Sequence, residues 1–202
     1  GADVDLASPA MTAFFDEMVE RGTAIDPTLP VMETVLLSER GKLADAYVPF
    51  AGTLPPQIER GFKAGSFSPP PTLTRETMRK SFAKLLALVA TLHKRGVPVL
   101  AGTDGTGLEL VRELELYVAA GMSPADALAC ATIVPATAFD LAGETGSITV
   151  GKKAELALIA GDPSKSIGDL RQVEIVMRDG HVMAVDDLRA AVGITGAPKP
   201  GT

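Results

Sequence analysis

Cysteine and histidine are both scarce in this sequence, which contains one cysteine and two histidines. A single cysteine excludes an internal disulfide and any cysteine-based metal motif, and it leaves the redox compartment open. Cys130 lies in the apolar stretch Ala-Asp-Ala-Leu-Ala-Cys-Ala-Thr, which is typical of a helix. A cysteine in such a place usually behaves as a small core residue, so we expect it to be structural rather than nucleophilic.

Basic residues are in the minority, and long apolar runs are lacking. Nineteen Lys and Arg face 25 Asp and Glu, which gives a net charge of -6 and a pI of about 5.0. Such a surface repels phosphate backbones, so we expect no nucleic-acid partner. The longest apolar run, near residues 83–92, covers about ten residues and contains Lys84, which is too short for a membrane span.

The sequence begins without an initiator methionine and without the basic-then-apolar layout of a signal peptide. We therefore expect that a preceding segment has been removed. The low thiol content favours a cytoplasmic protein, while a removed segment leaves an exported form open. The 202 residues, of which 46% are hydrophobic, suffice for one globular domain or two small ones.

Hydrophobic spacing predicts alternating helices and short strands up to about residue 143. A helix over residues 11–21 is followed by the β-prone residues 23–25, and a strongly amphipathic helix over residues 74–95 is followed by the apolar strand 97–102. A helix followed by a buried strand is the unit of an α/β barrel or a doubly wound sheet. Further helices are predicted over residues 108–120, from Ser123 onward, and after Pro135.

Two other regions differ from this pattern. Residues 49–72 are rich in proline and glycine, and we expect an irregular segment there, either a lid over a site or a flexible insertion. After Gly143 the sequence changes to short β-prone runs and an Asp179-Gly180 turn. We therefore divide the chain into an α/β body, residues 1–143, and a small β module with its tail, residues 144–202.

The stretch Val-Pro-Val-Leu-Ala-Gly-Thr-Asp-Gly-Thr-Gly, residues 97–107, is the most informative one for chemistry. In α/β barrels, catalytic groups project from the C-terminal ends of strands, and Asp104 occupies such a place. Asp104 also suits the cap of the helix expected near Leu108, or it favours the turn itself through its side chain. Position alone leaves the catalytic and the structural role open.

Residues 97 to about 183 resemble the amidohydrolase superfamily, in particular its imidazolonepropionase-like and prolidase-like branches. The resemblance rests on motifs in a fixed order: AGTDGTG, RELELYVAAGMSPADALACATIVPATAFDLAG, GSITVGKKAELALIAGDP and VEIVMRDGHVM. It implies an α/β fold: the C-terminal part of a TIM-type (β/α)8 metal-dependent hydrolase barrel, with residues 22–27 and 97–102 as strands seven and eight, plus a composite β-sandwich module.

The same resemblance implies that Asp104 is catalytic and faces or ligates the metal. Such an aspartate accepts a proton from metal-bound water and returns it to the leaving amine. The divalent metal is expected to be zinc. Glu155 stands where the family usually has aspartate, at a structural position, and the pair Arg112-Glu113 receives no role.

The histidines that hold the metal in the family, including a His-x-His pair, have no match in this sequence. His93 and His181 stand in other contexts, and we expect both to be structural. We therefore expect the N-terminal portion of the barrel as a partner, and a homo-oligomer is compatible with the sequence. The expected function is hydrolysis of an amide, cyclic amide or peptide bond in a small molecule or peptide. A deacetylase, a cyclohydrolase and a non-catalytic fragment that serves structure or assembly remain alternatives.

Overall fold

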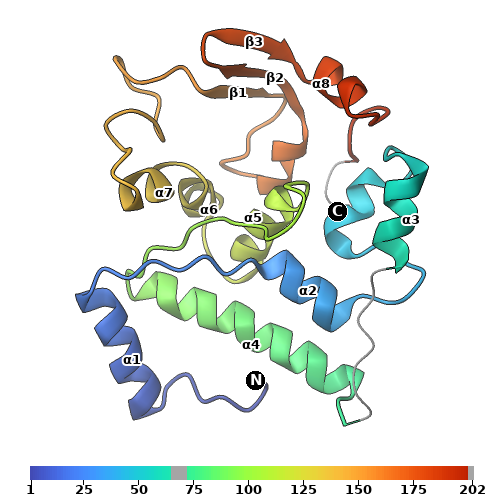
Figure 1. The fold of residues 1–202 in the computed structure, drawn as a ribbon. Coiled ribbons are helices and arrows are strands. Elements are labelled where there is room, and N and C mark those ends of the chain that lie inside the picture. The colour runs from blue at the N-terminus through green and yellow to red at the C-terminus, as the bar shows by residue number, and fades with distance from the viewer. Residues whose placement is uncertain (65–71, 200–202) are drawn as a thin grey trace.

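The computed structural model describes residues 1–64 and 72–199. Its α-helices are Pro9–Glu20 (α1), Leu29–Leu37 (α2), Pro56–Ala64 (α3), Arg75–Lys94 (α4), Leu110–Ala119 (α5), Pro124–Cys130 (α6), Ile133–Ala138 (α7) and Val185–Ala191 (α8). The 3-10 helices are Asp45–Phe50 (η1) and Ile167–Arg171 (η2), and the strands are Leu156–Ile159 (β1), Val173–Arg178 (β2) and His181–Ala184 (β3). Figure 1 shows a helical body with the strands gathered at one end.

The ends of the long helices follow local sequence signals. The side chain of Ser8 accepts a hydrogen bond from the Met11 amide at the start of α1, and Thr74 accepts one from the Thr77 amide at the start of α4. Gly22 and Gly96 follow these two helices with φ of +62° and +85°, a left-handed conformation that glycine adopts without strain. These helix boundaries confirm the sequence prediction to within two residues.

The two expected barrel strands are present only as one parallel bridge between Ile25 and Val99. The Ile25 amide donates to the Pro98 carbonyl at 2.9 Å, and the Leu100 amide donates to the Ile25 carbonyl at 2.7 Å. On the other edge, the amides of Val97 and Ala101 donate to the carbonyls of Leu92 and Cys130. Because the C-terminal ends of α4 and α6 take these donors in place of a strand, residues 97–102 form no continuous strand.

The core of the body surrounds the strand residue Val99. Its buried side chains come from α2, α4, α5 and α6 and include Leu29, Phe82, Val89, Leu114, Tyr117 and Cys130. A second cluster joins α1 to the end of α4 through Phe15, Met18, Leu92 and Val97. The burial of Cys130 agrees with its expected structural role. The packed helices thus place residues 97–101 firmly, although that segment pairs with only one other strand.

The β module is a three-stranded antiparallel sheet in the order β1-β2-β3. Asp179 and Gly180, with φ of 51° and 78°, form the tight turn between β2 and β3, as expected. One of the β-prone runs expected after Gly143, residues 146–151, forms no strand, and the side chains of Ile148 and Val150 are 90% and 103% exposed. Since no described strand lies beside them, these residues have nothing to pair with. Only this single sheet occurs among the described residues, so the expected sandwich is not observed.

Residues 49–64 are more regular than the sequence indicates. They contain the end of η1 and all of α3, which begins at Pro56, a residue well suited to the first position of a helix. The Gly41 amide donates to the Lys63 carbonyl at 3.0 Å and so closes residues 41–64 into a compact loop. The expectation of a wholly irregular segment was therefore wrong for residues 56–64, while residues 65–71 of that expectation lie outside the described part.

Candidate functional site

Asp104 lies on an exposed turn directly after the strand residues 97–101. Its φ is 47°, a left-handed conformation that is uncommon for a residue with a side chain. Helix α5 begins at Leu110 with Glu109 as its N-cap residue. Asp104 precedes that helix by too many residues to cap it, so the structure disfavours the alternative role of Asp104 as a helix cap.

Glu109 lies beneath the Asp104 turn and is only 2% exposed. Its carboxylate accepts hydrogen bonds from the Thr106 amide at 3.2 Å, the Thr106 hydroxyl at 3.1 Å and the Tyr47 hydroxyl at 2.5 Å. Burial opposes ionisation, yet the hydrogen bonds from Tyr47 and Thr106 keep the pKa of Glu109 below its usual value. Glu109 is therefore an ionised acceptor for three donors.

Asp26 is a second carboxylate at the same edge of the parallel pair. Asp26 follows Ile25, just as Asp104 follows the segment that pairs with Ile25. The side chain of Asp26 lies in the space beside Gly102. A Cβ atom on Gly102 would lie 2.1 Å from Asp26 Oδ2, so only glycine leaves room for this carboxylate. From the sequence, Asp26 was expected only as part of strand seven, residues 22–27.

Glu113 is fully buried on α5, and its side-chain contacts indicate its protonation state. The Tyr117 hydroxyl oxygen lies 2.6 Å from Glu113 Oε1 and 2.8 Å from the Leu100 carbonyl oxygen. A phenol has one hydrogen and the carbonyl can only accept, so Tyr117 donates to Leu100 and Glu113 must donate to Tyr117. Burial raises the pKa of Glu113 to about 8, with contributions from Asp26 and Glu33. Glu113 is thus a neutral acid at neutral pH.

Glu109, Glu113 and Tyr117 share one face of α5, because they are spaced four residues apart. This face contacts the Asp104 turn through Glu109 and the strand before it through Tyr117. From the sequence, Glu113 has no predicted role, because the spacing of three polar groups along a helix does not show that this face is turned toward the core.

Arg112, the neighbour of Glu113 on α5, joins a charged network. It donates to both carboxylate oxygens of Glu33, at 2.9 and 2.6 Å, and to Glu115 at 3.3 Å. Glu115 also accepts from Arg171 of η2. Because the Glu33 side chain is only 5% exposed, Arg112 neutralises a charge that would otherwise be buried alone.

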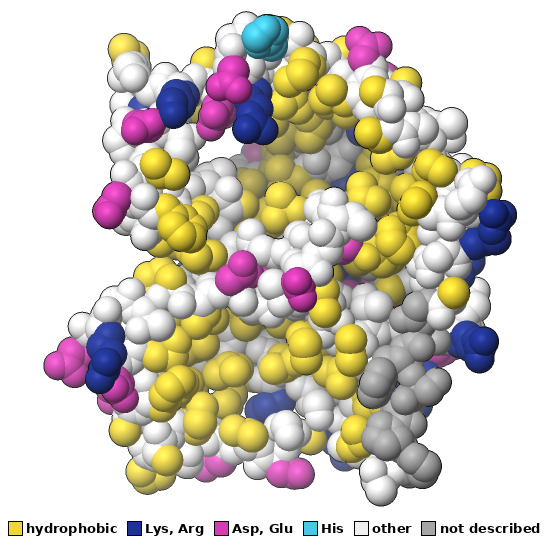
Figure 2. All heavy atoms as spheres, in the orientation of Figure 1, with side chains coloured by type: hydrophobic (Ala, Val, Ile, Leu, Met, Phe, Trp, Pro, Cys, Tyr) yellow, Lys and Arg dark blue, Asp and Glu magenta, His cyan; other side chains and the backbone are white. Residues whose placement is uncertain are grey.

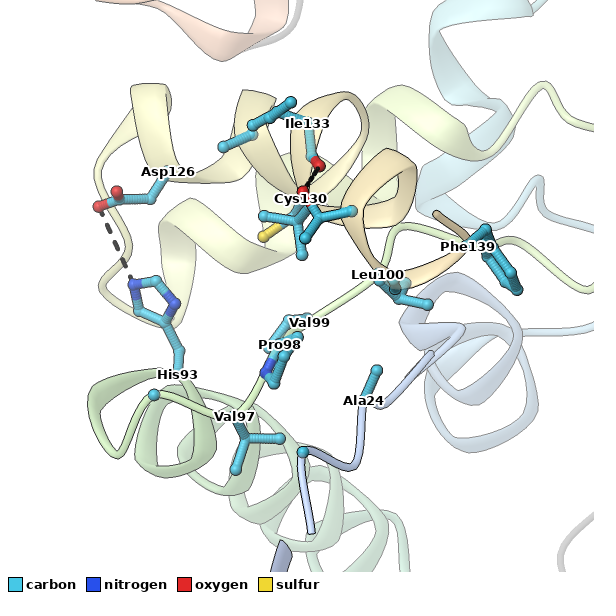
Figure 3. Close-up of a pocket in the computed structure, with 16 residues that line it drawn as sticks. Ala24, His93, Val97, Pro98, Val99, Leu100, Asp126, Cys130, Ile133 and Phe139 are labelled. Atoms are coloured by element: carbon cyan, nitrogen blue, oxygen red, sulfur yellow. Dashed lines mark hydrogen bonds and ion pairs between the residues drawn. The ribbon is translucent and has the colours of Figure 1, made fainter. Parts of the chain in front are cut away.

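His93 and His181 do not approach Asp104. His93 Nε2 lies 3.9 Å from Asp126 Oδ2 at the rim of a cavity of about 760 Å³, and His181 Nδ1 lies 3.1 Å from the Asp179 carbonyl oxygen. The cavity runs along the outer edge of residues 97–100, and Figure 3 shows its apolar walls. Burial raises the pKa of Cys130, which also lines it, to about 11, so its thiol is not activated.

A metal ion does not fit the described residues of this chain alone. Within residues 1–64 and 72–199, no group of three or more His, Cys, Asp and Glu side chains could hold a metal ion. One exposed carboxylate, Asp104, is too few ligands for zinc, which takes three or four from the protein. In the same described part, no helix is long and apolar enough to cross a membrane.

Comparison with known proteins agrees with this fold. Residues 9–184 match the model of the amidohydrolase family, and the chain therefore belongs to that family. A search of curated proteins gave no match. The matched residues include both strands of the parallel bridge, the Asp104 turn and the whole β sheet.

Several solved structures share the fold. A Xaa-Pro dipeptidase with bound methionine is 22% identical, with a TM-score of 0.60 over 91% of this chain and 38% of that one. A Bifidobacterium longum protein assigned as a prolidase is 28% identical, with a TM-score of 0.56 over 79% of this chain and 35% of that one. A prolidase in complex with N-methylphosphonate-L-proline is 23% identical, with a TM-score of 0.56 over 85% and 37%. The chain spans less than two fifths of the length of these structures.

Proposed function

We propose that this chain is the C-terminal part of a metal-dependent hydrolase that cleaves a carbon–nitrogen bond, with Asp104 as its acid and base. The observation that carries the proposal is the parallel Ile25–Val99 pairing in a chain of the amidohydrolase family. The carboxyl ends of parallel strands meet at one edge, which is where barrel enzymes place their catalytic groups.

Asp104 suits proton transfer because its carboxylate is exposed on a turn of defined shape. A carboxylate in this position accepts a proton from the attacking water and delivers it to the leaving amine. The zinc ion that such hydrolases commonly use would need ligands beyond this chain, since the described residues provide no cluster for it. We therefore propose that Asp104 transfers the proton, but not that it forms the metal site by itself.

The N-terminal part of the barrel is the partner that this proposal requires. One face of the β sheet is apolar in every row, because Leu156, Met177 and Val182 are aligned, as are Leu158, Ile175 and Ala184. Leu158 and Val182 remain 55% and 62% exposed on this face. Figure 2 shows hydrophobic side chains around the hollow between the sheet and the helical body. Strands from the rest of a sandwich would cover such a face.

The cavity beside residues 97–100 points to the same partner. It exposes the strand edge opposite Ile25 and is walled by Val97, Val99, Ile133 and Phe139. On the side away from Ile25, the amides of Val97 and Ala101 donate to the carbonyls of Leu92 and Cys130, so a further strand would have to replace these two bonds in order to pair here. We propose that the first strand of the completed barrel lies in this cavity.

Dipeptides ending in proline are the first substrates to test, because structures of a Xaa-Pro dipeptidase and of prolidases share the fold. The chain together with the polypeptide that completes the barrel should hydrolyse a Xaa-Pro dipeptide or a cyclic amide. Activity should disappear with a chelator and return with zinc. If the complete, zinc-loaded protein leaves dipeptides and cyclic amides intact, this assignment is wrong.

A non-catalytic role is the second candidate, favoured by the lack of a metal-binding cluster in the described part of the chain. In that case the chain stabilises a barrel by packing alone. Zinc would then bind no better to the assembled protein than to the isolated chain. Metal content measured on both samples separates the two proposals.

A further inference from the structure

The turn that bears Asp104 is held from beneath by a single buried carboxylate. Both oxygens of Glu109 are used: Oε1 accepts from the Thr106 amide and Oε2 from the Thr106 hydroxyl. A Cβ atom on Gly105 would lie 2.4 Å from Glu109 Oε1, so the turn rests directly on the carboxylate. Any displacement of Glu109 therefore displaces residues 104–106.

The third donor to Glu109 comes from a distant part of the chain. Tyr47, in η1, donates its hydroxyl to Oε1 at 2.5 Å across 62 residues of sequence. Its ring stacks on Phe62 of α3, with ring centroids 3.8 Å apart and planes inclined by 7°. Tyr47 thus belongs to the loop of residues 41–64 and contacts the Asp104 turn through Glu109.

This loop is itself a rigid unit. The Gly41–Lys63 hydrogen bond closes its base, and Glu59 binds both the Gly52 amide and the Lys63 side chain. The C-terminal tail holds its outer side, because the amides of Thr195 and Lys199 donate to the carbonyls of Thr53 and Pro49 at 2.8 Å each. Because these bonds tie the loop together and to the tail, we expect its position to be passed to Glu109 through Tyr47.

We propose that Glu109 is a positioning residue for Asp104 and that Tyr47 couples the loop of residues 41–64 to it. The loop, the Glu109 carboxylate and the Asp104 turn then shift together, and contacts of a substrate with the loop adjust the proton-carrying carboxylate. The catalytic part of this inference rests on the proposed function, whereas the coupling between loop and turn does not.

Three substitutions separate the hydrogen bonds from mere packing. Glu109→Gln keeps them, because the amide oxygen still accepts from Thr106 and Tyr47 and the amide nitrogen donates to the Thr106 hydroxyl. Glu109→Leu keeps the volume and removes all three. Tyr47→Phe removes only the link to the loop and leaves the stacking on Phe62 in place.

Amide hydrogen exchange of the 202-residue chain, followed by NMR, tests the coupling without any substrate. Glu109→Leu should speed exchange at Thr106 by about tenfold, and Glu109→Gln by less than about threefold. Glu109→Leu should also speed exchange at Gly41, at the base of the loop, and Tyr47→Phe should speed it at Thr106. Val89, buried in α4, serves as the internal control for global opening.

The coupling is refuted if Glu109→Leu leaves Thr106 exchange unchanged, or if Thr106, Gly41 and Val89 change by the same factor. In the complete enzyme, Tyr47→Phe should lower kcat more than it raises KM, and Glu109→Gln should restore most of the kcat that Glu109→Leu loses. A wild-type enzyme without hydrolytic activity would overturn the proposed function, while the exchange data would still decide the coupling.

Discussion

Glu113 donates a hydrogen bond to Tyr117, whose hydroxyl oxygen lies 2.6 Å away in the core of the body. The direction of this bond follows from the Leu100 carbonyl, which takes the only phenolic hydrogen at 2.8 Å. A buried neutral acid therefore lies directly behind the strand that leads to Asp104. Buried acids of this kind make stability depend on pH.

Glu113→Gln should change the pH dependence of stability. The pKa of Glu113 is raised from 4.5 to about 8 in the folded protein, so between these values the folded state holds a proton that the unfolded chain has lost. Rising pH then lowers the free energy of unfolding by up to about 1.4 kcal/mol per pH unit. Glutamine keeps the donor and does not titrate, so the variant should gain stability relative to wild type from pH 5 to pH 7.5. Urea denaturation at pH 5 and pH 7.5 measures the difference in free energy of unfolding between the variant and wild type. If that difference is the same at the two pH values, Glu113 is ionised in the folded protein.

Neither tyrosine should ionise at its usual pH while the protein remains folded. Burial is the main cause that raises the pKa of both Tyr47 and Tyr117 above 10, and each also contacts a carboxyl group, Glu109 and Glu113. Since the sequence has two tyrosines and no tryptophan, absorbance at 295 nm reports on them alone. The titration should be flat through pH 10 and rise only when the fold opens. A step near pH 10 that Tyr47→Phe abolishes would contradict the bond to Glu109.

Gly102→Ala should destabilise the body. The new Cβ atom would lie 2.1 Å from Asp26 Oδ2, so the exposed Asp26 side chain would have to leave the space beside residue 102. Because a side-chain end can turn away, the cost should lie near the lower end of the about 1–3 kcal/mol that overpacking typically costs. Gly61→Ala is the matched control, because nothing lies within 4 Å of a Cβ there, and alanine in α3 should be neutral or slightly stabilising. Thermal unfolding of the two variants compares them, and equal effects would show that Asp26 does not occupy this space.

Arg112→Met should leave Glu33 as an uncompensated buried carboxylate. Breaking a buried pair in this way costs about 3–5 kcal/mol. Adding Glu33→Met should recover much of that loss, because the double variant contains no unpaired charge at this point. Chemical denaturation of the single and double variants gives the coupling energy. If the double variant loses as much free energy of unfolding as the two single variants together, Arg112 and Glu33 do not interact as an ion pair.

The sequence predicted what depends on local chemistry. The ends of α4, at Thr74 and Gly96, and the Asp179-Gly180 turn depend only on neighbouring residues, and all are present. The family resemblance was confirmed by the match over residues 9–184. The role of Asp104, by contrast, remains a prediction, because proton transfer requires a substrate.

The predictions that were wrong have a different cause, because they depend on contacts between distant segments of the chain. Residues 97–102 form one bridge in place of a strand, because the ends of α4 and α6 accept the Val97 and Ala101 amides and only Ile25 pairs with the segment. Ile148 and Val150 are exposed because no described strand lies beside them. No local pattern tells which face of α5 is buried, so the sequence predicts no role for Glu113. Helix α3 lies in a segment whose prolines predict only irregular structure.

The activity of Asp104→Asn in the complete, zinc-loaded protein tests the central claim most directly. Asparagine fits the left-handed turn but cannot carry a proton, so kcat should fall by about 10²- to 10⁴-fold with the zinc content largely retained. Asp140→Asn, the same change at another exposed left-handed aspartate with φ of 58°, should keep the wild-type rate. If Asp104→Asn hydrolyses the substrate as fast as Asp140→Asn, Asp104 does not carry the proton and the proposed mechanism is wrong.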